Sequence, residues 1–396
     1  MSSIALTRIS YLHTIFSYIS DNYKEFWKLR RVNTSWQDCM INYSDEIWER
    51  IYINYKDDKG DTLLHHLIKK SGKQNLQNLL IRLLRKSDFI GRHGICLEKV
   101  NIYKETPLQI ACLNGNKECV KLLLEAGANK EVRGSYNRTP LHHACLNGHK
   151  ECVKLLLEAG ANKEANDLCN GTPLHTACSN GRKECVALLL EAGANKEATN
   201  RNDETPLQIA CCYGRTECVA LLLEAGANKE ATGTHNHTPL HTACLNGRKE
   251  CVALLLEAGA NKEEKTSSNC TPLHFACLHS HKECVALLLE AGANKEATNN
   301  TNKTPLQIAC YHGRTECVKL LLEKGANKEA KTLNNNTPLY FACLNGYREC
   351  VALLLEAGAN KESTNRNNET PLQIACRNGH TKCVELLLKA GAEDVR

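Results

Sequence analysis

Apolar side chains recur along most of the chain in a pattern that returns at one fixed interval. In a representative repeat, Leu141, Ala144 and Cys145 follow a Thr-Pro pair at the spacing that places them on one side of a helix. Thr139 suits the N-cap, where its hydroxyl meets a free amide, and Pro140 suits the first helical position, which needs no amide hydrogen. The pattern therefore predicts that each repeat opens with a short helix.

A second apolar run follows the Gly that ends each first helix. Gly148 favours a left-handed helix end, residues 151–158 predict a second helix with most of the bulky apolar side chains, and Gly160 ends it. The residues from there to the next Thr are polar and rich in Asn, Asp and Gly, as in a turn. Each repeat is therefore predicted to be two antiparallel helices and an extended turn, and the fold class is all-α.

The tripeptide Thr-Pro-Leu begins nine such repeats, and all nine prolines of the chain lie in these tripeptides. A fixed period of this length predicts a solenoid of stacked repeats instead of one globular core. A protein of this kind works by presenting a long surface to a partner. The repeat threonines are Thr106, Thr139, Thr172, Thr205, Thr238, Thr271, Thr304, Thr337 and Thr370.

The recurring sequence TPLHHAC, followed by NG and ECVKLLLEAGAN, closely resembles the ankyrin repeat, with Cys in place of an Ala and of a Val. The resemblance implies an ankyrin-repeat solenoid of nine repeats over residues 105–396, the last of them a C-terminal cap. Residues 57–104 resemble a degenerate first repeat and a linker. The repeats differ at a few fixed places: the His after Leu becomes Gln109, Gln208, Gln307, Gln373 or Tyr340, and Ser280 replaces the Gly that ends a first helix.

Residues 1–56 differ from the repeats because they hold all three tryptophans of the chain. Their apolar spacing predicts three short amphipathic helices, which form only a marginal core alone. The apolar and Trp positions resemble an F-box, although no Pro precedes the first Leu. The resemblance implies an F-box-like helical domain whose apolar patch binds a Skp-family adaptor through Leu12, Ile15, Phe16, Ile19, Leu29, Val32 and Trp36. The alternative is a helical cap whose Trp and Leu side chains pack on the first repeat.

The net charge of +6 on 396 residues is modest, and Lys and Arg are interleaved with Glu in nearly every repeat. This favours a solvated surface of mixed charge over a nucleic-acid-binding stripe. No run of 18 apolar residues occurs, so no membrane span is expected, and the N-terminus lacks the apolar stretch of a signal peptide. Seven Asn residues that lie two positions before a repeat Thr are interpreted as turn residues and not as glycosylation sites.

Eighteen of the 23 cysteines occupy two fixed repeat positions on the apolar sides of the predicted helices. We expect these thiols to be reduced and buried, which suits a reducing compartment, and the lack of any CxxC pair argues against a zinc site. The recurring histidines are interpreted as structural, because one active site is not built by placing the same residue in every repeat. With no HExxH or GxxxxGK motif, neither catalysis nor a cofactor is predicted. These histidines are His142, His175, His241 and His274.

Variation between the repeats is concentrated before each Thr-Pro pair and at the end of the first helix. In ankyrin proteins these positions line the concave face and bind partners, and aromatic and Arg side chains are the better anchors. Drift at unconstrained exposed positions would produce the same variation. The candidate target-binding residues are Tyr136, Arg138, Leu168, Arg201, Tyr213, His235, His237, Tyr311, Leu333 and Tyr347.

Taken together, the two resemblances imply a substrate receptor of a Skp–cullin–F-box ubiquitin ligase that is not itself an enzyme. Residues 1–56 would bind the adaptor and thereby the cullin complex, and the ankyrin array would bind an unknown target protein. Such a chain is expected to be a monomer apart from its partners and to act in the cytoplasm, or in the host cytoplasm or nucleus as a viral or bacterial effector. The alternative is a non-catalytic ankyrin scaffold or inhibitor with no role in ubiquitin transfer.

Overall fold

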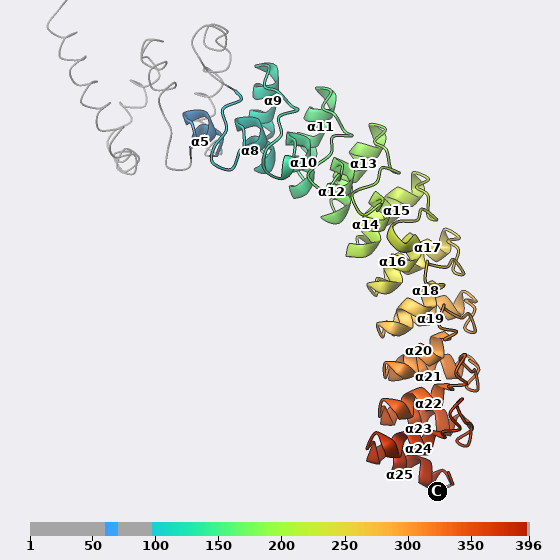
Figure 1. The fold of residues 1–396 in the computed structure, drawn as a ribbon. Coiled ribbons are helices and arrows are strands. Elements are labelled where there is room, and N and C mark those ends of the chain that lie inside the picture. The colour runs from blue at the N-terminus through green and yellow to red at the C-terminus, as the bar shows by residue number, and fades with distance from the viewer. Residues whose placement is uncertain (1–59, 70–96, 394–396) are drawn as a thin grey trace, which may run out of the picture. The chain divides into compact units, whose positions relative to one another are not determined.

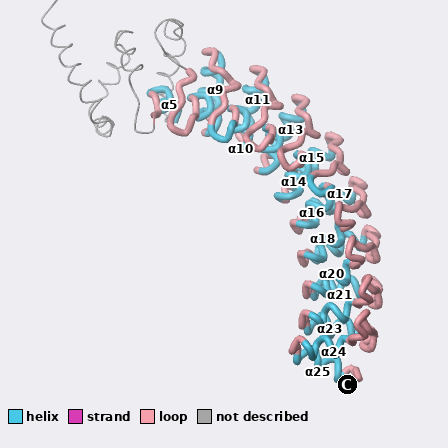
Figure 2. The backbone as a smooth tube through the Cα atoms, viewed as in Figure 1, coloured by secondary structure: helices cyan, strands magenta, loops and turns pink. Residues whose placement is uncertain are grey.

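A computed structural model describes residues 60–69 and 97–393 of the chain (Figure 1). The chain divides into two compact units, Met1–Leu168 and Cys169–Arg396, and each is described by itself. Within the described residues the regular elements are all helices, joined by turns and loops (Figure 2). The F-box-like segment expected at residues 1–56 lies outside the described residues.

The described part of the N-terminal unit contains two complete helix pairs, α8–α9 and α10–α11, preceded by the single helix α5. The first helices α5, α8 and α10 pack in sequence, and the second helices α9 and α11 pack on each other. The elements are α5 (Leu63–Lys69), α8 (Pro107–Leu113), α9 (Lys117–Glu125), the 3-10 turn η2 (Ser135–Asn137), α10 (Pro140–Asn147) and α11 (Lys150–Glu158).

The C-terminal unit contains seven helix pairs in the same arrangement. Each first helix packs on the first helices of the neighbouring pairs, and each second helix does likewise. The elements are α12 (Pro173–Ser179), α13 (Lys183–Glu191), α14 (Pro206–Tyr213), α15 (Thr216–Glu224), the 3-10 turn η3 (Thr234–Asn236), α16 (Pro239–Leu245), α17 (Lys249–Glu257), α18 (Pro272–Leu278), α19 (Lys282–Glu290), α20 (Pro305–Tyr311), α21 (Thr315–Glu323), α22 (Pro338–Leu344), α23 (Arg348–Glu356), α24 (Pro371–Arg377) and α25 (Thr381–Lys389).

Thr and Pro start the first helices as the sequence predicts. Thr139 is the N-cap of α10 in extended conformation, and Pro140 occupies the first turn. Gly148 then ends α10 in the left-handed conformation with φ 80°, which confirms the predicted helix end. The second helix α11 begins at Lys150, one residue before the predicted start.

The core of each repeat consists of the apolar positions that the pattern singles out. Leu141, Ala144 and Cys145 of α10 are fully buried, as are Val153 and Leu156 of α11. Because α10 and α11 are each only two to three turns long, most of their stability comes from this packing and little from helix propensity alone.

The cysteine prediction is correct at 17 of its 18 positions. The described cysteines are all free, and those at the two repeat positions are buried, with the exception of Cys376. Cys376 lies on α24, which packs on the first helix α22 of the preceding repeat but has no described first helix on its other side. Cys376 is therefore exposed, and the expectation of burial is wrong at this position.

The turn asparagines adopt the conformation that their interpretation requires. All nine residues two positions before a repeat Thr have φ between 54° and 60°. Asn tolerates this left-handed region better than other residues with a side chain, because its short amide can bond the local backbone. Seven of the nine are Asn, and the others are Lys104 and Asp203.

A recurring hydrogen bond from a backbone amide to a Glu carboxylate connects successive repeats in the turns that follow the second helices. The backbone amide of Asn162 donates to a carboxylate oxygen of Glu131, 2.8 Å away in the preceding repeat. Asn228 makes the same bond to Glu197 at 2.9 Å, again over 31 residues. The recurring Lys-Glu and Asn-Lys pairs of the sequence thus hold neighbouring repeats in register.

Candidate functional site

The recurring histidines connect each repeat to the next and are structural, as interpreted. In α16, Nδ1 of His241 accepts a hydrogen bond from the backbone amide of Thr238 at 3.2 Å, and Nε2 lies 3.1 Å from the carbonyl oxygen of Cys270 in the next repeat. The amide must be the donor, so Nδ1 carries no proton, and Nε2 carries the proton that it donates to Cys270. His175 and His274 make the same pair of bonds.

The glutamines at the equivalent position make the same two connections. Oε1 of Gln208 accepts from the amide of Thr205 at 2.8 Å, and Nε2 donates to the carbonyl oxygen of His237 at 2.7 Å and of Ala231 at 3.2 Å. An amide side chain has one acceptor and one donor end, as does a neutral imidazole. This equivalence explains why either His or Gln can stand at this position without a change in repeat length.

Burial keeps these imidazoles neutral. Desolvation lowers the pKa of His241 and of His274 to about 4. A neutral ring is also what the hydrogen bonds require, because a proton on Nδ1 would face the donating amide of the repeat Thr. The histidines therefore have neither the free nitrogen nor the exposure that acid–base or metal chemistry would need.

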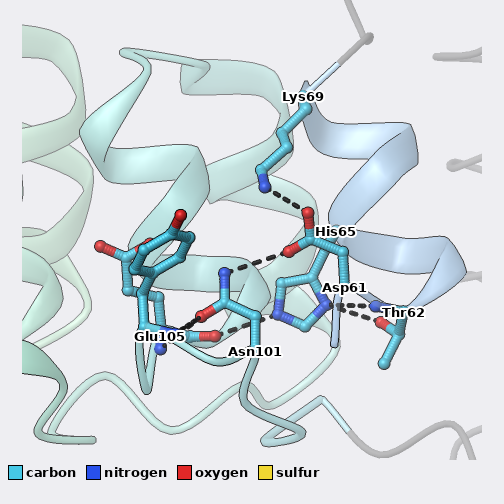
Figure 3. A network of polar contacts seen from close by, with 7 residues as sticks. Asp61, Thr62, His65, Lys69, Asn101 and Glu105 are labelled. Atoms are coloured by element: carbon cyan, nitrogen blue, oxygen red, sulfur yellow. Dashed lines mark hydrogen bonds and ion pairs between the residues drawn. The ribbon is translucent and has the colours of Figure 1, made fainter. Parts of the chain in front are cut away.

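Helix α5 is fixed to the following turn by a network of polar side chains (Figure 3). Asp61 accepts a hydrogen bond from the side-chain amide of Asn101 at 3.0 Å and forms an ion pair with Lys69. His65 accepts from the backbone of Thr62 and bonds the carbonyl oxygen of Glu105, as the repeat histidines do. Burial by itself raises the pKa of Asp61, but the hydrogen bonds from Lys69 and Asn101 outweigh it, and the pKa lies below its usual value. The network is a structural clamp.

The spacing in this clamp reflects the longer connection that follows α5. His65 bonds a carbonyl group 40 residues further along the chain, whereas His175 bonds one 29 residues further. The greater separation for His65 marks an insertion between α5 and the next Thr-Pro pair. Apart from this insertion, α5 makes the same contact with its successor as the first helix of a regular repeat.

The candidate target-binding residues lie at the turn tips and at the ends of the first helices, with the exception of Tyr347, which directly precedes the second helix α23. Tyr136 and His235 lie in the 3-10 turns η2 and η3, both with positive φ, and both are exposed. Leu168, Arg201 and Leu333 lie at the tips of other turns and are also exposed. Consecutive tips are joined by backbone bonds, such as that from the amide of Leu168 to the carbonyl of Tyr136 at 2.8 Å.

The candidate tyrosines at the helix ends have two different environments. Tyr213 and Tyr311 are the last residues of α14 and α20. Tyr347 instead precedes α23, and its ring lies so close to Gly313 that a Cβ added there would come within 2.5 Å of the ring. Tyr347 therefore packs on the preceding repeat and occupies the place that His281 and Arg314 take elsewhere.

In the C-terminal unit, side chains at turn tips contact side chains of the first helices, and we call these turn tips and first-helix ends the tip face. His237, from the turn after η3, has its ring 4.9 Å from the ring of Phe275 in α18. Lys303, from the turn before α20, has its ammonium 4.2 Å from the ring centre of Tyr311. These contacts bring together side chains from separate turns and helices of the chain.

Sequence reasoning missed the position that follows the structural His or Gln. Phe275 and Phe341 occupy it in α18 and α22 and contact candidate residues, at 4.9 Å to His237 and 5.7 Å to Tyr311 between ring centres. The signal was present, because this position changes between Ile, His, Thr and Phe from repeat to repeat while the Ala that follows it does not change.

His143 occupies the same position in α10, in the N-terminal unit. It is buried, neither ring nitrogen has a hydrogen-bond partner, and desolvation lowers its pKa to about 4. The guanidinium of Arg138 adds to this shift and lies 5.3 Å from the ring centre of Tyr136.

The described residues hold no group of three or more His, Cys, Asp or Glu side chains arranged to bind a metal ion. Among the same residues, none of the helices combines the length and the apolar character that crossing a bilayer requires.

The fold defines a helical repeat protein in which successive turns present exposed side chains. A family model described as "Ankyrin repeats (3 copies)" matches the chain in overlapping windows that run from residues 39–134 to 327–396. The chain belongs to the ankyrin repeat family, whose repeats are protein-interaction modules.

Solved ankyrin structures have the same fold. The crystal structure of the human ASB11 ankyrin repeat domain is 32% identical, with a TM-score of 0.51, and the match covers 57% of this chain and 100% of that one. The ankyrin repeat domain of Bcl-3, a unique member of the IkappaB protein family, is 30% identical with a TM-score of 0.50, over 55% of this chain and 98% of that one. No curated protein sequence matches the chain significantly.

Proposed function

We propose that the chain is a substrate receptor of a Skp–cullin–F-box ubiquitin ligase, in which the tip face binds the target protein. The observation that carries the target-binding part is the contrast between a nearly constant buried core and a tip face that varies from repeat to repeat. The exposed aromatic side chain of Tyr213 lies on this face, and aromatic residues of this kind dominate interface energetics. The ligase part rests on the F-box resemblance of residues 1–56.

The mechanism that follows is proximity. Neither the repeats nor the F-box-like segment would perform chemistry. The chain would raise the local concentration of a target lysine beside a ubiquitin-loaded enzyme that other subunits carry. The free thiols of the described residues fit a reducing compartment, and we place this activity in the cytoplasm, or in the host cytoplasm or nucleus if the chain is an effector.

One observation favours the alternative function of a scaffold or inhibitor without a role in ubiquitin transfer. The match to ankyrin repeats begins at residue 39, within the segment assigned to the F-box. In that alternative the N-terminal segment caps the array, and its apolar side chains pack on the first repeat.

The deciding experiment is capture of a purified Skp-family adaptor by the full-length chain. We expect the wild type to bind the adaptor and the double substitution Ile15→Ala/Phe16→Ala to abolish binding, because both side chains belong to the implied docking patch. The matched control is Tyr136→Ala/Leu168→Ala at two turn tips, which should leave adaptor capture unchanged. Failure of the wild type to bind, or full binding by the Ile15/Phe16 variant, would contradict the F-box assignment and favour the alternative, in which residues 1–56 form a helical cap.

The target-binding half has its own test. Truncation of a true anchor on the tip face should cost about 2 kcal/mol or more of binding free energy, while its neighbours cost little. Leu156→Ala, in the core, should lower the free energy of unfolding by about 2–5 kcal/mol and affect binding only through unfolding. An alanine scan of the ten candidate residues, with circular dichroism to confirm folding, separates the two effects for any captured partner.

A further inference from the structure

Lys303 differs in charge and in partner from the Glu that holds its position in three other repeats. It directly precedes a repeat Thr, where Glu105, Glu204 and Glu369 stand in three other repeats. Glu369 forms an ion pair with Arg377, eight residues further on. Lys303 instead meets Tyr311, also eight residues further on, with its ammonium 4.2 Å from the ring centre.

The aromatic contact of Lys303 extends to a second ring. Its ammonium is 5.0 Å from the ring centre of Phe341, and the Phe341 and Tyr311 rings meet edge to face at 5.7 Å. Two aromatic rings from successive repeats thus flank one cation. A cation on the face of a ring is attracted by the ring quadrupole, but its positive charge is not neutralised.

No described carboxylate lies within 4.0 Å of the Lys303 ammonium. The ionisable groups that act on the neighbouring His312 are all bases. Desolvation is the largest cause that lowers the pKa of His312, and Arg314, Lys303 and His279 lower it further. Arg314 uses its Nε to bond the carbonyl oxygen of Leu278. The site is therefore a half-buried cluster of positive charge and aromatic rings in which the Lys303 ammonium has no ion-pair partner among the described residues.

We propose that Lys303, Tyr311 and Phe341, with His279 and His312 beside them, form a subsite for an acidic side chain of the target protein. The ammonium would donate to the carboxylate, the rings would cover the methylene groups of a Glu or Asp, and the two imidazoles would add donors. Binding would supply the counter-charge that the site lacks. This inference rests on the proposed target-binding role of the tip face and is independent of the F-box assignment.

The surroundings favour an acidic protein segment over a nucleic acid. The same repeat position carries Glu204 three repeats before Lys303 and Glu369 two repeats after it. A polyanion lying along the tip face would meet these carboxylates, whereas a single Glu or Asp of a folded partner would meet only the positive cluster. Electrostatic complementarity of this local kind confers specificity on a binding surface.

The test uses the full-length chain and two fluorescent dodecapeptides of equal length, one with three Glu and the other with Gln at those places. We expect the Glu peptide to bind in a fluorescence anisotropy titration at low salt and the Gln peptide to bind at least about tenfold more weakly, since one lost charge-assisted contact is worth that factor. Lys303→Met should remove this preference. Lys319→Met, which deletes an exposed charge on the second helix α21, should leave it unchanged.

Tyr311→Leu provides a second variant that keeps the fold, because Leu stands at this position in five other repeats: Leu113, Leu146, Leu245, Leu278 and Leu344. It should weaken binding of the Glu peptide while thermal unfolding stays close to that of the wild type. Equal binding of the two peptides, binding of neither, or equal losses in the two lysine variants would overturn the proposal. So would tighter binding of a single-stranded DNA 12-mer than of the Glu peptide. Adaptor capture is measured separately, so a failure of the ligase role is distinguishable from a failure of this subsite.

Discussion

Arg314 bonds back to the preceding repeat, where its Nε donates to the carbonyl oxygen of Leu278, 2.9 Å away. The same bond joins Arg248 to Cys212 at 3.1 Å, and His281 bonds Leu245 at 3.2 Å through Nε2. In each case the N-cap residue of a second helix satisfies a carbonyl near the end of the previous first helix, where helical partners run out. The side chain of this N-cap residue also passes close to the turn residue that follows the previous first helix.

This close approach explains why that turn residue is Gly. At Gly247, with φ 65°, an added Cβ would come within 2.4 Å of the His281 ring. At Gly214, with φ 67°, it would meet the more flexible Arg248 side chain at 2.8 Å. Ser280 is the one repeat residue at this place with a side chain, and its φ is 66°. The residue at the corresponding place in the next repeat is Arg314, so Ser280 faces a flexible side chain and not a ring.

We predict that Ser280→Gly stabilises the array by about 1 kcal/mol, since it removes the cost of a side chain in the left-handed region. The reverse change, from Gly to Ser, should be destabilising, and the size of the loss should depend on the side chain that the turn residue faces. Gly247→Ser should lower the free energy of unfolding more than Gly214→Ser, because the His281 ring cannot move aside as the Arg248 side chain can. Urea unfolding of the three variants tests this. A destabilised Ser280→Gly protein, or the opposite order for the two Gly variants, would contradict the explanation.

The alternation of His and Gln leads to a second prediction. His241→Gln should change the free energy of unfolding by less than about 1 kcal/mol, because Gln208 makes the same two connections in the preceding repeat. His241→Ala should cost about 2–4 kcal/mol, since it leaves the Thr238 amide and the Cys270 carbonyl without their partner. Chemical denaturation of the two variants side by side is the measurement. Equal losses in the two variants would show that Gln cannot replace His241 and would contradict the equivalence.

The cysteines give a third prediction, on reactivity. Cys376 is exposed, whereas Cys211 is fully buried and desolvation raises the pKa of its thiol well above the usual value. Because the thiolate is the reactive form, N-ethylmaleimide should modify Cys376 within the first labelling pulse and leave Cys211 unmodified in the folded protein. Tandem mass spectrometry of the two tryptic peptides, which assigns the label to Cys211 and distinguishes it from the adjacent Cys212, reads the result, and unfolding in urea should equalise the rates. Rapid modification of Cys211 without urea would show that the array opens locally.

Much of the fold could be predicted from the sequence because its determinants are local. The N-cap Thr, the first-turn Pro, the helix-ending Gly and the turn Asn each act on their immediate neighbours in the chain, and the structure confirms them. The side-chain contacts of the tip face could not be predicted in the same way. Lys303 meets Phe341 and His237 meets Phe275, and each of these contacts depends on how one repeat rests on the next. The exposure of Cys376 likewise depends on whether another helix covers α24.

The neutral histidines make stability depend on pH, and the sign follows from their pKa values. Burial lowers the pKa of His241 and His274 from 6.5 to about 4, so between these values the unfolded chain binds more protons than the folded one. The contribution of these two histidines to the free energy of unfolding is therefore fully present above pH 6.5. It is lost as the pH falls towards 4, by an amount on the order of 3 kcal/mol for each group.

The double variant His241→Gln/His274→Gln should keep the inter-repeat bonds and lose less stability over this range. His235→Gln, at an exposed tip, is the matched control and should behave as the wild type. The measurement is urea unfolding from neutral pH down towards the folded-state pKa, and equal pH slopes in the wild type and the double variant would show that these histidines are not the groups that titrate.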